Sequence, residues 1–185
     1  MISEPDPGAG TRMQNASGQF VSGSYGGRNY RLYVPKGYAA GQPSPLILMM
    51  HGCLQDGGQF ATSTAMNDLA DNHAVLVVYP DQPTSANGAQ CWNWFNAGDQ
   101  ARGGGEPAFM AGLVSLVASK YTVDAERTYA LGFSAGAGMA VILGAAYPDV
   151  FAAIAVGSGL EYKATTSSGK RAVGQFTPFD LVLLI

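Results

Sequence analysis

The stretch YALGFSAGAGMAVILGAAYP, residues 129–148, passes from a short apolar strand pattern into a helix pattern, and Ser134 stands at the junction. Residues 132–136, GFSAG, match the pattern G-x-S-x-G, which gains its meaning from lying between a strand and a helix. Lifting a serine out of such a turn forces its backbone into a strained conformation that costs roughly 1–3 kcal/mol. Side chains two positions before and after Ser134 would then collide, so Gly132 and Gly136 must be glycine or nearly so. A simple serine helix cap would explain Ser134 but not the preceding glycine. The stretch therefore predicts a nucleophilic serine on a sharp turn.

The periodicity on either side of this turn alternates between strands and helices. Short apolar or alternating runs indicate strands, and longer amphipathic runs indicate helices. The expected strands lie in 18–35 (an antiparallel pair), 45–52, 74–80, 127–133 and 151–159, and the expected helices in 57–73, 106–121 and 134–147. Such alternation predicts an α/β fold with a mostly parallel sheet and helices on both faces. We divide the chain into a flexible N-terminal segment (1–19), a single core domain (20–163) and an atypical C-terminal tail (164–185).

Composition excludes several classes of protein. The chain is 47% hydrophobic and 12% charged with a formal net charge of −3, which suits a globular domain and offers no basic surface for nucleic acid. No apolar run reaches the length of a membrane span. We expect no nucleic-acid partner, no membrane span, no cofactor and no metal site. The N-terminal residues have none of the features of a secretory signal, so we interpret them as a mature or engineered start.

A second candidate site feature lies upstream, in MMHGCLQDGG (49–58), where His51 and Gly52 turn the chain out of a strand. A serine hydrolase must stabilise the oxyanion of its tetrahedral intermediate with backbone N–H groups. One donor follows the nucleophile and the other comes from a loop of this kind. Ala135 and Cys53 are therefore the candidate oxyanion donors.

Residues 80–105, PDQPTSANGAQCWNWFNAGDQARGGG, fit neither period and are too long for an ordinary connection. Trp92 and Trp94 argue against a solvated segment. We predict that they form an aromatic wall beside a ligand, and the alternative is a loop pinned to the core. Cys53 and Cys91, the two cysteines, allow one pairing, but free buried thiols would look the same in the sequence.

Several of these stretches together resemble the polyhydroxybutyrate depolymerase and feruloyl esterase group of α/β-hydrolases. They are HGCLQDGGQFATSTAMNDLAD (51–71), VVYPDQ (77–82), CWNWF (91–95), GEPAFMAGLV (105–114) and GFSAGAGMAVILGAAYPDVFAAIAVGSGL (132–160). The resemblance covers residues from about 20 to 163. It implies a secreted or periplasmic carboxylesterase that uses Ser134, an oxyanion loop at residues 51–54, a substrate wall at Trp92 and Trp94, and a Cys53–Cys91 disulfide. It leaves open whether the ester is small or polymeric, and it implies nothing about the oligomeric state.

The sequence also departs from that family. In the family the catalytic acid and histidine follow the nucleophile, yet here no histidine follows Ser134. We interpret the tail as truncated or altered after the sixth strand, with its last apolar run replacing a missing strand. His51 is expected to brace the oxyanion turn, and His73 to close a helix, where a cation suits the helix dipole. Among the acids, Asp149, Glu161 and Asp180 are expected to be solvated surface charges, and none is assigned a role.

The main functional expectation, given the resemblance, is acyl transfer from a polyester or a plant phenolic ester to Ser134 and then to water. One alternative is an acyltransferase with the same turn, which would favour an alcohol over water. A second is a non-catalytic binder of an ester or a polymer, which would retain the pocket without turnover.

Overall fold

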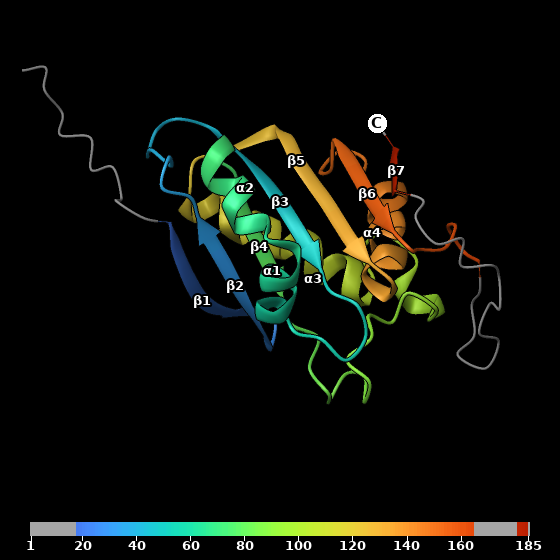
Figure 1. Ribbon diagram of the computed structural model, residues 1–185. Coiled ribbons are helices and arrows are strands. Elements are labelled where there is room, and N and C mark those ends of the chain that lie inside the picture. Colours follow the sequence, from blue (N-terminus) through green and yellow to red (C-terminus); the bar gives the residue numbers. More distant parts are fainter. Residues whose placement is uncertain (1–17, 165–180, 185) are drawn as a thin grey trace, which may run out of the picture.

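The computed structural model describes residues 18–164 and the backbone of residues 181–184 (Figure 1). Its strands are β1 (Gln19–Tyr25), β2 (Arg28–Val34), β3 (Ser44–Met50), β4 (Leu76–Pro80), β5 (Val123–Phe133), β6 (Ala153–Gly157) and β7 (Leu181–Leu184). Its helices are α1 (Gly57–Thr64), α2 (Met66–His73), α3 (Gly105–Lys120) and α4 (Ala135–Ala146), with a 3₁₀ turn, η1 (Ala97–Asp99).

These strands form one sheet in the order β1-β2-β4-β3-β5-β6-β7. The central pairs β4–β3, β3–β5 and β5–β6 are parallel, whereas β1–β2, β2–β4 and β6–β7 are antiparallel. Helices α1 and α2 cover one face, and α3 and α4 cover the other (Figure 1). The predicted α/β fold with a mostly parallel sheet and helices on both faces is confirmed.

The two faces of the sheet carry separate hydrophobic clusters. The larger one joins the sheet to α3 and α4 and includes Leu48, Met110 and Met139, all fully buried. The smaller one, under α1 and α2, includes Phe60, Ala70 and Tyr79. Strand β4 is buried along its whole length, as its continuous apolar run predicts.

Residues 57–73, expected as one helix, form two. The break is at Ala65, whose φ of 50° is left-handed. The Thr64 hydroxyl donates to the Phe60 carbonyl, and the Thr62 hydroxyl donates to that of Gly58. Such bonds from a side chain back to the helix compete with the regular ladder, which explains why the run of hydroxyl residues ends α1.

The sheet also extends one strand beyond the six expected ones. Residues 181–184 of the tail pair antiparallel with β6, from Gly157 opposite Leu181 to Ile154 opposite Leu184. The tail's apolar run therefore takes a place in the sheet, as its interpretation as a replacement strand predicts. At the other end of the chain, β1 begins at Gln19, inside the N-terminal segment expected to be flexible; residues 1–17 lie outside the described part.

Because β3, β5 and β6 run parallel, their carboxyl ends lie along one edge of the sheet. The chain leaves these strands at His51, Ser134 and Ser158. Residues far apart in the sequence, the turn after β3 and the turn after β5, are thus brought to the same edge.

Candidate active site

Ser134 occupies the turn between β5 and α4 with a φ of 53° and a ψ of −115°. This conformation is strained for a residue with a side chain. The neighbouring elements hold it: the Ser134 N–H donates to the Gly157 carbonyl at the end of β6 (2.9 Å), and the Ser134 carbonyl accepts from Ala137 and Gly138 (3.0 and 3.1 Å). The turn is therefore fixed by the sheet on one side and by the first turn of α4 on the other.

The glycines around Ser134 are required by backbone contacts. A Cβ at Gly132 would clash with the backbone at Gly136, and a Cβ at Gly136 would clash with the carbonyl oxygens of Met50 and His51. The collision predicted for both positions is confirmed. Moreover, the second contact shows that the first turn of α4 lies directly against the end of β3.

The loop after β3 approaches Ser134 closely. A Cβ at Gly52 would lie 3.5 Å from the Ser134 Cβ, which places the loop beside the serine. On this loop the Gly52 N–H donates to Gln55 Oε1 (3.0 Å) and the Leu54 N–H donates to the Ala89 carbonyl (2.8 Å). Between them, the Cys53 N–H has no hydrogen-bond partner among the described residues.

The N–H of Ala135, the first residue of α4, also has no partner within the described part of the chain. The first N–H groups of a helix point outward along its axis and lack intrahelical acceptors. Helix α4 therefore presents a free donor and the positive end of its dipole beside Ser134. The loop after β3 and the start of α4 thus each carry an N–H group near Ser134 that has no partner among the described residues.

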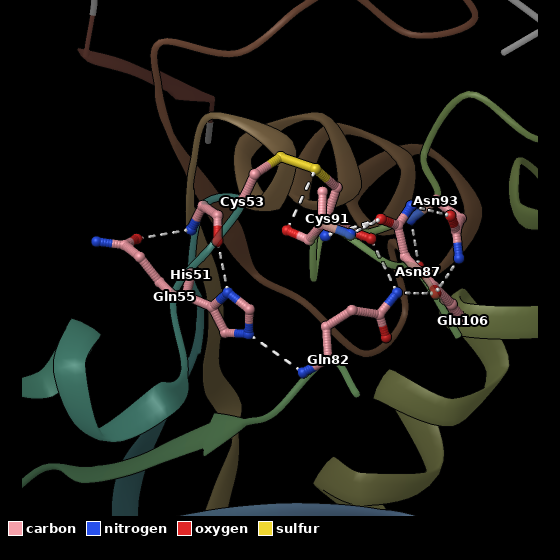
Figure 2. The surroundings of a disulfide bond; sticks show 10 residues. His51, Cys53, Gln55, Gln82, Asn87, Cys91, Asn93 and Glu106 are labelled. Atoms are coloured by element: carbon pink, nitrogen blue, oxygen red, sulfur yellow. Dashed lines mark hydrogen bonds between the residues drawn. A yellow bond between two sulfur atoms is a disulfide. The ribbon is translucent and has the colours of Figure 1, made fainter. Parts of the chain in front are cut away.

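His51 is fully buried behind this loop, and both of its ring nitrogens are used (Figure 2). Nε2 accepts from the Gln82 backbone N–H (3.2 Å), so Nδ1 carries the proton and donates to the Gly52 carbonyl (2.7 Å). Burial lowers the pKa of His51, which favours this neutral form. The expected bracing role is confirmed, and the engaged Nε2 leaves no lone pair for proton abstraction.

His73 lies at the other end of the sheet, since it ends α2 just before the amino end of β4. Strands β4 and β5 have the same direction, so Ser134 is at the opposite edge. Asp149 forms an exposed ion pair with Arg102, and hydrogen bonding to Arg102 lowers the pKa of Asp149 to about 2. Glu161 is exposed, and Asp180 lies outside the described residues.

Cys53 and Cys91 form a disulfide, as the resemblance implies (Figure 2). It links the loop after β3 to residues 80–105. The Leu54–Ala89 hydrogen bond runs beside it. The long segment is therefore fastened to the candidate oxyanion loop by one covalent bond and by backbone contacts.

The two tryptophans of the long segment have different surroundings. Trp92 has no exposed surface and packs against His51, with ring centroids 5.3 Å apart. The expectation that Trp92 forms a substrate wall is thus corrected: its apolar area and its proximity to His51 make it a core residue. Trp94 is half-buried and lies over Gly138, where a Cβ would be 2.8 Å from Trp94 Cγ. It remains beside the first turn of α4.

Glu106, to which the sequence analysis gives no role, is buried and accepts hydrogen bonds from three other residues, two of which, Gln82 and Asn93, are drawn in Figure 2. They come from Arg28, Gln82 and Asn93. The signal that could have found this cluster is the group of amide side chains in residues 80–105, namely Gln82, Asn87, Gln90, Asn93, Asn96 and Gln100.

Three large apolar side chains are exposed in the turns at this edge of the sheet or next to them. Leu54 is 74% exposed, Phe133 46% and Tyr162 39%. Within the described residues, no group of three or more His, Cys, Asp or Glu side chains is placed to bind a metal ion. None of the described helices is long and apolar enough to cross a membrane.

Several known proteins are similar to this chain. A family model described as esterase PHB depolymerase matches residues 28–173. Poly(3-hydroxyalkanoate) depolymerase C of Paucimonas lemoignei is 38% identical over 135 residues, which are 73% of this chain and 32% of the relative. Feruloyl esterase B of Thermothelomyces thermophilus is 32% identical, over 72% of this chain and 45% of the relative.

Among solved structures, an acetyl xylan esterase from Aspergillus awamori matches with a TM-score of 0.71 and 27% identity. The match covers 86% of this chain and 58% of that chain. The present chain thus spans less than two thirds of the length of each of these three proteins.

Proposed function

Because this chain belongs to the esterase PHB depolymerase family, we propose that it is a carboxylic ester hydrolase in which Ser134 is the nucleophile. The observation that carries the proposal is the strained backbone of Ser134 beside two N–H groups, those of Cys53 and Ala135, that have no partner among the described residues. The N–H groups of Gly52 and Leu54, on either side of Cys53, both have acceptors. Of these three N–H groups, that of Cys53 is therefore the one left to bind an oxyanion.

In the proposed reaction, Ser134 Oγ attacks the ester carbonyl carbon, and the Ser134 proton passes to solvent water. The carbonyl oxygen becomes an oxyanion that accepts hydrogen bonds from Cys53 and Ala135. The alcohol then leaves with a proton, and water hydrolyses the acyl-serine to release the acid. Neither histidine of this sequence can remove the Ser134 proton, because His51 is engaged and His73 lies at the far edge.

The proposed substrates are esters with an apolar part, small or polymeric. Leu54, Phe133 and Tyr162 expose apolar surface in or beside the turns at the carboxyl edge of the sheet, and Trp94 lies at the first turn of α4. The names of the relatives refer to hydroxyalkanoate polymers, feruloyl esters and acetylated xylan. These substrates have different acyl groups and have in common only that they are carboxylic esters. The disulfide supports a secreted or periplasmic location.

A non-catalytic ester or polymer binder is the second candidate. The observation that favours it is the lack of an imidazole beside Ser134 within this sequence. Such a protein would bind an ester and never form an acyl-serine.

Incubation of the 185-residue chain with p-nitrophenyl butyrate, followed by intact-mass and peptide analysis, tests the proposal. We expect slow p-nitrophenolate release and a butyryl group on Ser134, since an oxyanion hole and binding alone retain roughly 10³–10⁴-fold acceleration over water. The variant Ser134→Ala should show no such adduct. Equal acylation of both proteins at other residues would refute the nucleophile, and reversible binding without an adduct would favour the binder.

A further inference from the structure

A buried carboxylate lies behind the candidate oxyanion loop and takes no part in the mechanism above. Glu106, the second residue of α3, is 2% exposed. Its Oε1 accepts from Arg28 Nη2 (3.2 Å), Gln82 Nε2 (2.6 Å) and Asn93 Nδ2 (2.9 Å), and its Oε2 accepts from the Asn93 N–H (2.7 Å). Four donors therefore converge on one charged group.

One route leads from this carboxylate through Gln82 to the loop. The Gln82 backbone N–H donates to His51 Nε2, and His51 Nδ1 donates to the Gly52 carbonyl. That carbonyl belongs to the peptide unit whose N–H is the Cys53 donor. Hydrogen bonds joined through the side chain and backbone of Gln82 thus connect Glu106 to the peptide unit of the Cys53 N–H (Figure 2).

A second route reaches the same residue through the disulfide. Gln82 Nε2 also donates to the Cys91 carbonyl (2.9 Å). Asn93 Oδ1 accepts from Asn87 Nδ2 (2.8 Å), and Asn87 Oδ1 accepts from the Cys91 N–H (3.4 Å). Cys91 is then bonded to Cys53.

We propose that Glu106 is a positioning residue that sets the place and direction of the Cys53 N–H, an inference that rests on the proposed oxyanion role of that group. Residues 51–54 contain no helix or strand, so the loop depends on such contacts for its geometry. Hydrogen bonds to an ionised acceptor are shorter and stronger than neutral ones. A donor displaced by a fraction of an ångström no longer meets a developing oxyanion.

The charge of Glu106 is essential to this arrangement because each of its oxygens accepts from at least one N–H donor. Glutamine has nearly the same shape but presents an NH₂ group in place of one oxygen. An NH₂ group at the Oε1 position would face the side-chain donors of Arg28, Gln82 and Asn93, and one at the Oε2 position would face the Asn93 N–H. The substitution therefore disturbs the loop without opening a cavity.

The test compares Glu106→Gln with the full chain and with Glu126→Gln, an exposed glutamate near the start of β5, at the far edge of the sheet. The rate of acylation of each protein is measured with p-nitrophenyl butyrate and with the matching thionoester, in which sulfur replaces the carbonyl oxygen. Sulfur accepts hydrogen bonds poorly, so only the oxygen ester should benefit from the Cys53 donor. We expect Glu106→Gln to slow acylation by the oxygen ester by about tenfold or more, since a lost oxyanion donor costs about 10²–10³-fold. The thionoester rate should change little.

Equal slowing of both esters would indicate a general loss of structure and would overturn the proposal, as would rates equal to those of Glu126→Gln. If Glu106→Gln does not fold, the variant Gln82→Met tests the proposal instead. It removes the side-chain amide that donates to both Glu106 and the Cys91 carbonyl, but it keeps the Arg28–Glu106 ion pair. It should lower the oxygen-ester rate selectively, and an unchanged ratio would overturn the proposal. Failure of the proposed function looks different: the full chain would then form no Ser134-dependent adduct with either ester.

Discussion

Removal of the Cys53–Cys91 disulfide is expected to destabilise the fold mainly through the unfolded chain. The two cysteines are 38 residues apart. For a loop of that length, the chain-entropy relation gives a stabilisation of about 4 kcal/mol at 25 °C. In a chain of this size, that free energy corresponds to a fall in Tm of about 8–16 °C. The variant Cys53→Ala/Cys91→Ala tests this value.

The measurement is urea and thermal unfolding followed by circular dichroism, with and without a phosphine reductant. The reduced parent protein should unfold like the double variant, and reductant should leave the double variant unchanged. The Leu54–Ala89 and Gln82–Cys91 hydrogen bonds remain available in both, so the folded loop has the same non-covalent contacts. Equal unfolding free energies for the oxidised parent and the double variant would refute the loop-closure argument.

Three further predictions follow. Burial lowers the pKa of His51, so the unfolded chain binds more protons than the folded chain at low pH, and the free energy of unfolding should fall as the pH drops below about 6.5. Urea unfolding at a series of pH values should show a less steep fall for His51→Gln than for the parent protein. A Cβ at Gly136 meets backbone oxygens, so Gly136→Ala should lose about 1–3 kcal/mol of unfolding free energy, whereas Gly88→Ala, at a site with nothing within 4 Å, should not; equal effects would contradict the clash. Arg102→Ala should raise the pKa of Asp149 from about 2 towards 3.8 in an NMR titration, and an unchanged pKa would assign the shift to another cause.

The turn at Ser134 could be predicted because its constraint is local. A strand that passes directly into a helix leaves no room for side chains at positions 132 and 136, and this requirement is visible as the spacing of two glycines around a serine. The order of strands and helices could be predicted for a similar reason, because the hydrophobic period of each segment is set by its own side chains. The early end of α1 was not predicted. It involves hydrogen bonds from the Thr62 and Thr64 hydroxyls, which a hydrophobic period does not reveal.

The surroundings of Trp92 and Glu106 could not be predicted in the same way. An aromatic side chain in a long loop has the same appearance in the sequence whether it faces a ligand or the core, and only the packing of that loop against His51 places Trp92 inside. A glutamate in the first turn of a helix likewise has the same appearance in the sequence whether it is exposed to solvent or buried among hydrogen-bond donors. Its partners Arg28 and Gln82 come from β2 and from the loop after β4.

The sequence by itself determined the class of fold, the serine turn and the pair of cysteines, because each depends on residues adjacent in the chain or on a count. Tertiary structure alone decided which N–H groups stay free beside Ser134 and which imidazole nitrogens are engaged. Those properties depend on the parallel register of β4, β3, β5 and β6, which brings distant turns to one edge of the sheet. A hydrogen bond requires two groups within about 3 Å of each other, and for groups so far apart in the chain that distance is set only when the sheet has formed.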